Sequence, residues 1–245
     1  MSYIKKISLP FFWLIIASAF SSLSAQSTFN GWLASFNSFK TGKKTSIVAD
    51  IQLRSTDEIK QIQTILIRPG FSAHLNKHVT VTAGYAFIGA KRISGTATAL
   101  MPEHRIWEQL LLTHKLKRVV VSHRFRLEQR FLSKSIVVNN ELERDGSAYA
   151  NRFRYFIRGL IPLKNEPVFK KGCFAALQNE VFMNFGNTST VNNETFDQNR
   201  FYVAVGYRLH PSFDLETGYL NQYVNGRNKS FSNNHVVQIA GYLRL

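Results

Sequence analysis

The chain has 245 residues, of which 44% are hydrophobic, and a formal net charge of +16. Its single cysteine excludes an internal disulfide framework, and 14 glycines and 6 prolines exclude collagen-like and low-complexity classes. The basic residues are spread over alternating positions and short turns instead of forming one patch, so we expect no binding to nucleic acid.

The first 25 residues have the pattern of a secretory signal peptide. Lys5 and Lys6 precede an apolar stretch at 7–20, and small residues lead to a predicted cleavage site after Ala25. The apolar stretch is shorter than the ~20 residues that a membrane-spanning helix needs. The sequence therefore predicts two parts, a signal peptide at 1–25 and one exported domain at 26–245. Cleavage would remove two lysines and no acidic residue, which leaves a net charge of +14.

The exported part shows repeated alternation of apolar and polar residues, the pattern of β-strands with two different faces. At 46–54, for example, Ile47, Ile51 and Leu53 alternate with Asp50, Gln52 and Arg54. This reading predicts eleven strands, at 31–39, 46–54, 64–75, 79–88, 105–114, 119–131, 150–161, 173–185, 198–209, 213–223 and 235–245. The faces of 105–114 cannot be assigned from the pattern.

The connections between these strands alternate between short and long. Tight turns follow Phe39, Leu75, His114 and Leu209. Long polar loops are predicted at 89–104, 132–148, 186–197 and 224–233, and an intermediate, lysine-rich connection at 162–172. Outer-membrane β-barrels have such short periplasmic turns and longer external loops, and strands of about 9–11 residues cross a bilayer when tilted.

The fold class that this pattern predicts is all-β, a single antiparallel transmembrane β-barrel of about 10–12 strands. Because bacterial barrels of this kind have an even number of strands, we expect one segment to be misread and favour twelve strands. A soluble periplasmic β-sandwich or lipocalin-like barrel is the alternative. The polar face, rich in arginine and glutamine, argues against it, as do the aromatic residues of the apolar face, Tyr85, Phe87, Tyr207, Phe213, Tyr219 and Tyr223.

The most informative segment is 123–131, His-Arg-Phe-Arg-Leu-Glu-Gln-Arg-Phe, in which every second residue is charged. It resembles a stretch of a family of uncharacterised bacterial outer-membrane proteins known as domain of unknown function 2490. Further similar motifs are Trp32, Arg105-Ile-Trp-Glu-Gln109, Asn151-Arg-Phe-Arg-Tyr155, Asp197-Gln-Asn-Arg200 and Gly206-Tyr-Arg208. The resemblance implies an outer-membrane barrel without an assigned activity. The Ala25–Gln26 junction also resembles those of exported proteins from the Bacteroidetes group.

If the polar faces line one lumen, they carry a surplus of arginine, a residue that stays charged and binds carboxylates through a planar fork. The lumen-lining residues that we predict are Arg124, Arg126, Glu128, Arg130, Arg152, Arg154, Arg158, Glu180, Arg200, Arg208 and Glu216. Arg54, Arg68, Arg244, Asp50 and Asp214 belong to the same faces, and the side of Glu108 is left open. These charges either pair into a plug or leave a passage that favours anions.

No catalytic residue, metal ligand or cofactor is predicted, and we do not expect an enzyme. Ser122 and His123 are adjacent in sequence and so face opposite sides of a strand, which prevents a dyad between them. Three functions remain open: a structural or pore-type outer-membrane barrel that passes or binds small anions, a barrel enzyme acting on envelope lipid, and a surface protein that binds through its external loops. The expected partners are outer-membrane lipid and a small anionic solute, and the oligomeric state is not predicted.

Overall fold

The computed structural model describes residues 26–164, 166 and 168–245, and the predicted signal peptide lies outside them. Two 3-10 turns, η2 (Asp57–Ile59) and η3 (Thr188–Thr190), lie between strands, and no helix of the described residues is long and apolar enough to cross a membrane. The strands are β1 (Gln26–Lys40), β2 (Thr45–Ser55), β3 (Ile62–His74), β4 (Val79–Ser94), β5 (Ala97–Leu116), β6 (Val119–Val138), β7 (Glu141–Pro162), β8 (Gly172–Phe185), β9 (Phe196–His210), β10 (Phe213–Asn225) and β11 (Phe231–Arg244).

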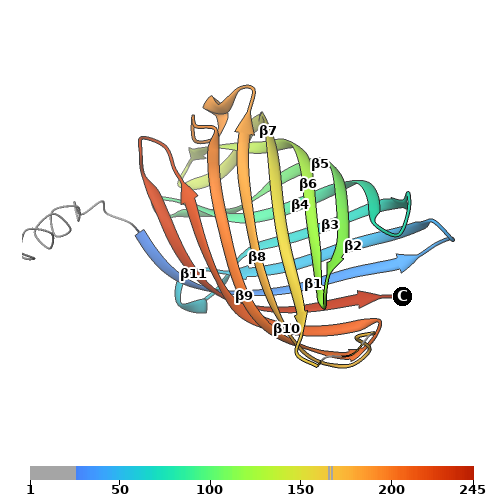
Figure 1. The fold of residues 1–245 in the computed structure, drawn as a ribbon. Helices are drawn as coiled ribbons and strands as arrows, with labels where there is room; N and C mark the ends of the chain where they lie inside the picture. The colour runs from blue at the N-terminus through green and yellow to red at the C-terminus, as the bar shows by residue number, and fades with distance from the viewer. Residues whose placement is uncertain (1–25, 165, 167) are drawn as a thin grey trace, which may run out of the picture.

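These strands form one closed barrel in which each strand pairs with its neighbours in the chain and β1 pairs with β11. Successive strands are antiparallel, so an odd number of strands brings the first and the last together in parallel. The start of β1 and the C-terminus consequently lie at opposite ends of the barrel (Figure 1). The all-β barrel is confirmed, whereas the preference for twelve strands is wrong, because the odd count is satisfied by this parallel seam.

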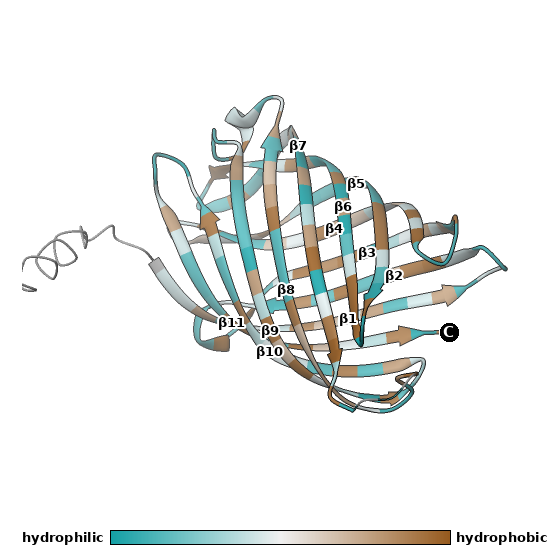
Figure 2. Cartoon of the chain, in the orientation of Figure 1, coloured by the Kyte–Doolittle hydropathy of each residue, from teal (hydrophilic) through white to brown (hydrophobic). Residues whose placement is uncertain are grey.

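The barrel has an apolar outside and a polar inside. On β9, Val203 points outward with 46% of its surface exposed, whereas its neighbours Tyr202 and Ala204 point inward and are buried. On β7, Arg152 and Arg154 are buried in the interior. The alternation of polar and apolar residues along each strand is visible in Figure 2. A soluble barrel has the opposite distribution, so the outward apolar wall identifies a transmembrane β-barrel.

Two of the predicted long loops are instead parts of strands. The segments 89–104 and 132–148 form hairpins that continue the barrel wall, with tight turns at Gly95–Thr96 and at Asn139–Asn140. Gly95, Asn139 and Asn140 adopt positive φ angles, which such two-residue turns favour. These predictions are wrong because polar and apolar residues are mixed on both faces of the hairpins, so no strict alternation appears, although Ala97, Met101 and Leu142 pack together on the inside. The segment between β8 and β9, 186–195, is a loop as predicted.

Apolar side chains fill part of the interior. One cluster gathers Trp32, Phe174, Tyr202, Leu220 and Val236 around β1 and β8–β11. Across the barrel, a second cluster contains Leu66, Ala86, Ile88 and Trp107 on β3–β5. These clusters narrow the lumen and form apolar walls on which the charged side chains lie.

Candidate functional site in the barrel lumen

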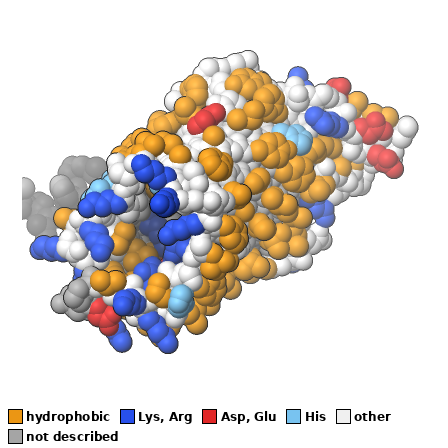
Figure 3. Space-filling model, turned by 90° about the vertical axis from the view of Figure 1, so that its right-hand side faces the viewer, with side chains coloured by type: hydrophobic (Ala, Val, Ile, Leu, Met, Phe, Trp, Pro, Cys, Tyr) orange, Lys and Arg blue, Asp and Glu red, His pale blue; other side chains and the backbone are white. Residues whose placement is uncertain are grey.

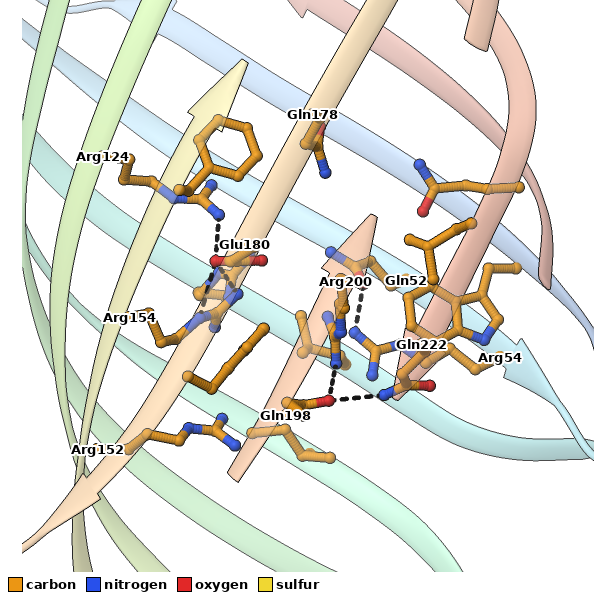
Figure 4. A pocket seen from close by; sticks show the side chains of 18 of the residues that line it. Gln52, Arg54, Arg124, Arg152, Arg154, Gln178, Glu180, Gln198, Arg200 and Gln222 are labelled. Carbon is orange, nitrogen blue, oxygen red and sulfur yellow. Dashed lines mark hydrogen bonds and ion pairs between the residues drawn. The ribbon is translucent and has the colours of Figure 1, made fainter. Parts of the chain in front are cut away.

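Two buried carboxylates at the centre of the lumen hold a network of arginines. Glu128 on β6 is 1% exposed and accepts hydrogen bonds from Arg152 at 2.7 Å and from Arg154 at 2.6 Å. Glu180 on β8 accepts from Arg154 and from Arg124, both at 2.7 Å. Arg154 therefore bridges the two carboxylates (the pairs at Glu180 appear in Figure 4). Replacing one member of such a buried ion pair is strongly destabilising, because the charge of the other member is left without a partner.

Further ion pairs extend along the lumen in both directions. Toward the β4–β5 turn, Glu103 pairs with Arg105 and Arg130, each at 2.7 Å. Toward the C-terminus, Asp214 binds Arg208 at 2.7 Å and Arg244 at 2.8 Å. Four other pairs complete the set: Asp50 with Arg68, Asp197 with Arg152, Glu216 with Arg158, and Glu128 with Arg105 at 3.4 Å.

Arginine nevertheless outnumbers acid on the inward face. The acids are Asp50, Glu103, Glu128, Glu180, Asp197, Asp214 and Glu216, all in ion pairs. Three inward arginines, Arg54, Arg126 and Arg200, make no ion pair with a carboxylate of the described residues. Each donates instead to a glutamine oxygen: Arg54 to Gln52 at 2.8 Å, Arg126 to Gln109 at 2.6 Å and Arg200 to Gln198 at 3.3 Å. The lumen is thus left with uncompensated positive charge.

The arginines surround a cavity of about 460 Å³ inside the barrel. Nine arginines but only two acids, Glu180 and Asp197, line it. A second cavity of about 280 Å³ lies on the side of the β1–β2 turn. Both cavities touch Phe36, Arg124 and Tyr242, which therefore mark the boundary between them. The lumen consists of two chambers joined at these three side chains.

The end of the barrel that carries the short turns and the C-terminus has a strongly basic rim. Figure 3 shows Lys and Arg side chains gathered around the hollow at this end. The turns and strand ends there contribute eleven basic residues, against the exposed acid Glu166 and the buried acid Asp214: Lys40, Lys43, Lys44, Lys77, Lys115, Lys117, Arg118, Lys164, Lys170, Lys171 and Arg244. At the opposite end, acids such as Glu141, Glu143 and Asp145 accompany the basic residues. A positive rim attracts anions and raises their local concentration.

The structure places all eleven predicted lumen residues on the inward face of the barrel, where Arg126, Glu128 and Glu216 are among the most buried. Sequence reasoning missed Glu103, Arg105 and Asp197. A signal for the first two exists in the alternation Glu103-x-Arg105-x-Trp107. Glu108 lies on the outward face, where it is exposed and accepts a hydrogen bond from Gln129 at 3.1 Å.

The wall residues considered for catalysis do not form a nucleophilic pair. Ser122 lies near Thr113, at 3.4 Å between their hydroxyl oxygens, whereas the His123 ring bonds the hydroxyl of Tyr155 at 2.9 Å. Among the described residues, no group of His, Cys, Asp and Glu side chains could hold a metal ion. The charged lumen is therefore the site with the most distinctive chemistry.

Comparison with known proteins agrees with the family that the motifs suggested. An uncharacterised protein of Methylorubrum extorquens is 24% identical over 197 residues, which cover 80% of this chain and 79% of that protein. Among solved structures, the NanC porin in a rhombohedral crystal form is similar, with a TM-score of 0.49 and 13% identity over 88% of this chain and 98% of that one. The model of the family described as "Protein of unknown function (DUF2490)" matches residues 29–233. Because this match covers most of the chain, the protein belongs to the DUF2490 family.

Proposed function

We propose that this protein is an outer-membrane barrel that passes or binds small anions in its lumen. The observation that carries the proposal is the surplus of inward arginine, since Arg54, Arg126 and Arg200 have no carboxylate partner among the described residues while every inward acid is paired. A permanently positive lumen lowers the free energy of an anion and raises that of a cation. The basic rim likewise attracts anions and repels cations.

The outward apolar wall supports a location in a membrane, and the predicted signal peptide supports export to the outer membrane. Fractionation of the producing cells tests this location, because the protein should co-sediment with outer-membrane markers. Recovery with inner-membrane or soluble markers would contradict it.

The function is tested by recording single channels of the refolded protein, residues 26–245, in a planar bilayer. With a potassium chloride gradient across the bilayer, the reversal potential reports the ratio of anion to cation permeability. We expect discrete current steps and a potential of the sign that anion selectivity requires. The triple variant Arg54→Gln, Arg126→Gln, Arg200→Gln should lose most of this selectivity. Arg144→Gln, an exposed site on β7, serves as the control and should keep it.

Cation selectivity would overturn the proposal. Absence of current from protein that is shown to be folded and inserted would reject passage of inorganic ions. In that case anion binding, measured by calorimetry on the folded protein, would decide whether the lumen serves as a binding cavity.

A further inference from the structure

Two of the unpaired arginines reach the same aromatic ring from different sides of the barrel. Arg54 comes from β2 and Arg200 from β9, and their guanidinium carbons lie 4.1 Å and 5.0 Å from the ring centre of Trp32. Figure 4 shows both side chains in the cavity, together with Gln52, Gln198 and Gln222. Two positive charges are thus held beside one indole without a carboxylate of the described residues bound to either.

Each of these guanidinium groups also has an unused donor. The Nε atoms of Arg54 and Arg200 are buried and have no hydrogen-bond partner in the described part of the chain. A buried N–H without a partner lowers the stability of the fold, and the loss is larger when the group is charged. Arg54 and Arg200 thus both keep a buried donor without a partner beside the same ring. A preformed site for an external hydrogen-bond acceptor has such free donors.

The surrounding residues define the chemistry of that acceptor. The Nε–Nη edge of arginine is a fork that matches two oxygens of a carboxylate or phosphate group. Gln222 donates to Gln198 at 2.7 Å, and Gln198 also accepts from Arg200 at 3.3 Å, so the amides are tied into the same cluster. The cluster faces the 460 Å³ cavity, which has room for a small polar solute.

We propose that Arg54, Arg200 and Trp32 form an oxyanion-binding site inside the cavity of about 460 Å³. This site binds the carboxylate or phosphate group of a small solute. This inference rests on the proposed function, because it identifies where an anion in the lumen binds. The solute's oxyanion offsets the positive charge of the two guanidinium groups, in part for a carboxylate and more fully for a phosphate group, and accepts hydrogen bonds from their unused Nε donors. Chloride satisfies the charge but cannot match the fork.

Trp32 provides a direct readout of binding. The variant Trp107→Phe leaves Trp32 as the only tryptophan of residues 26–245. In this variant, refolded in detergent at constant ionic strength, we expect phosphate or acetate to change the fluorescence in a saturable way and chloride to have no such effect. A response to phosphate alone assigns the site to phosphate groups, and a response to acetate alone assigns it to carboxylates.

Arg54→Gln and Arg200→Gln, each added to this background, should weaken binding at least about tenfold, because each variant loses a charge-assisted hydrogen bond to the oxyanion. Arg144→Gln should not alter it. Equal responses to chloride and phosphate, or unchanged binding in both arginine variants, would overturn the proposal. If Trp107→Phe does not fold, thermal unfolding of the unmodified protein with and without phosphate replaces the fluorescence titration, and the stabilisation must disappear in Arg54→Gln.

The two proposals can fail separately. Anion selectivity without saturable binding would leave the proposed function standing and reject this site. Saturable binding without any conductance would keep the site and reject passage through the lumen.

Discussion

Phe36 on β1 stacks on Tyr242 on β11, with ring centres 4.9 Å apart and ring planes inclined by 19°. The two residues are also register partners across the parallel pair that closes the barrel. The seam created by the odd number of strands therefore places a ring pair at the boundary between the two chambers.

This ring pair should limit passage between the chambers. Phe36→Ala removes one ring, so we expect the single-channel conductance to rise above that of the unmodified protein. Tyr242→Phe is the matched control, because it keeps the ring and loses only the hydrogen bond to Glu216 at 3.2 Å. Its conductance should stay unchanged. Identical conductance in Phe36→Ala and the unmodified barrel would show that the narrowest point lies elsewhere.

Glu128 and Arg126 lie two residues apart on β6 and should respond in opposite ways to loss of charge. Glu128→Gln leaves Arg152 and Arg154 without their shared carboxylate, which should lower the free energy of unfolding by about 3–5 kcal/mol. Arg126→Gln removes a charge that has no carboxylate partner in the described residues, and stability should stay the same or increase. Urea unfolding in detergent micelles measures both. Similar losses in the two variants would contradict the assigned ion-pair network.

The alternation of residues was sufficient to predict the inside and outside of most strands. Where a strand crosses the apolar layer, one face must be apolar, as in Ile47-x-Ala49-x-Ile51, and the pattern is therefore strict. It failed on 105–114 because an outward acid, Glu108, and an inward tryptophan, Trp107, interrupt it. The long hairpins escaped detection for a related reason, since polar and apolar residues are mixed on both of their faces.

The alternation gave the correct count of eleven strands, but the way the barrel closes and the unpaired arginines could not be read from it. Eleven strands close only because β1 and β11 pair in parallel, and parallel pairing over a sequence separation of about 200 residues has no local signature. Likewise, alternation assigns Arg200 to the inward face but does not reveal which acid lies within its reach. Glu180, the nearest candidate by strand register, is already bound to Arg124 and Arg154.

On β4, the backbone of Pro69 and the ring of Trp107 leave no free space for a side chain at Gly84. A Cβ atom there would lie 2.6 Å from the Trp107 ring and would also collide with the carbonyl oxygen of Pro69. Gly84→Ala should therefore lower the free energy of unfolding by about 1–3 kcal/mol, the usual range for overpacking. Gly159→Ala is the control, because its Cβ would meet only Val119, at 3.6 Å. Denaturant unfolding of both variants checks this, and equal stability would mean that Trp107 moves away freely.

The membrane orientation of the wall can be tested with the same substitution on its two faces. Val203 lies outward in the middle of β9 and is 46% exposed, whereas Val224 on the adjacent β10 lines the inner cavity. An arginine facing lipid near the midplane costs roughly 2–4 kcal/mol, so Val203→Arg should reduce stability in lipid vesicles by about that amount and slow insertion. Val224→Arg places the charge in the lumen and should be milder. Folding into vesicles, followed by the shift in gel mobility between folded and heat-denatured protein, distinguishes them. If the inward variant proved the more damaging, the apolar wall would not be the lipid-facing surface, and the proposal of a transmembrane anion path would fall with it.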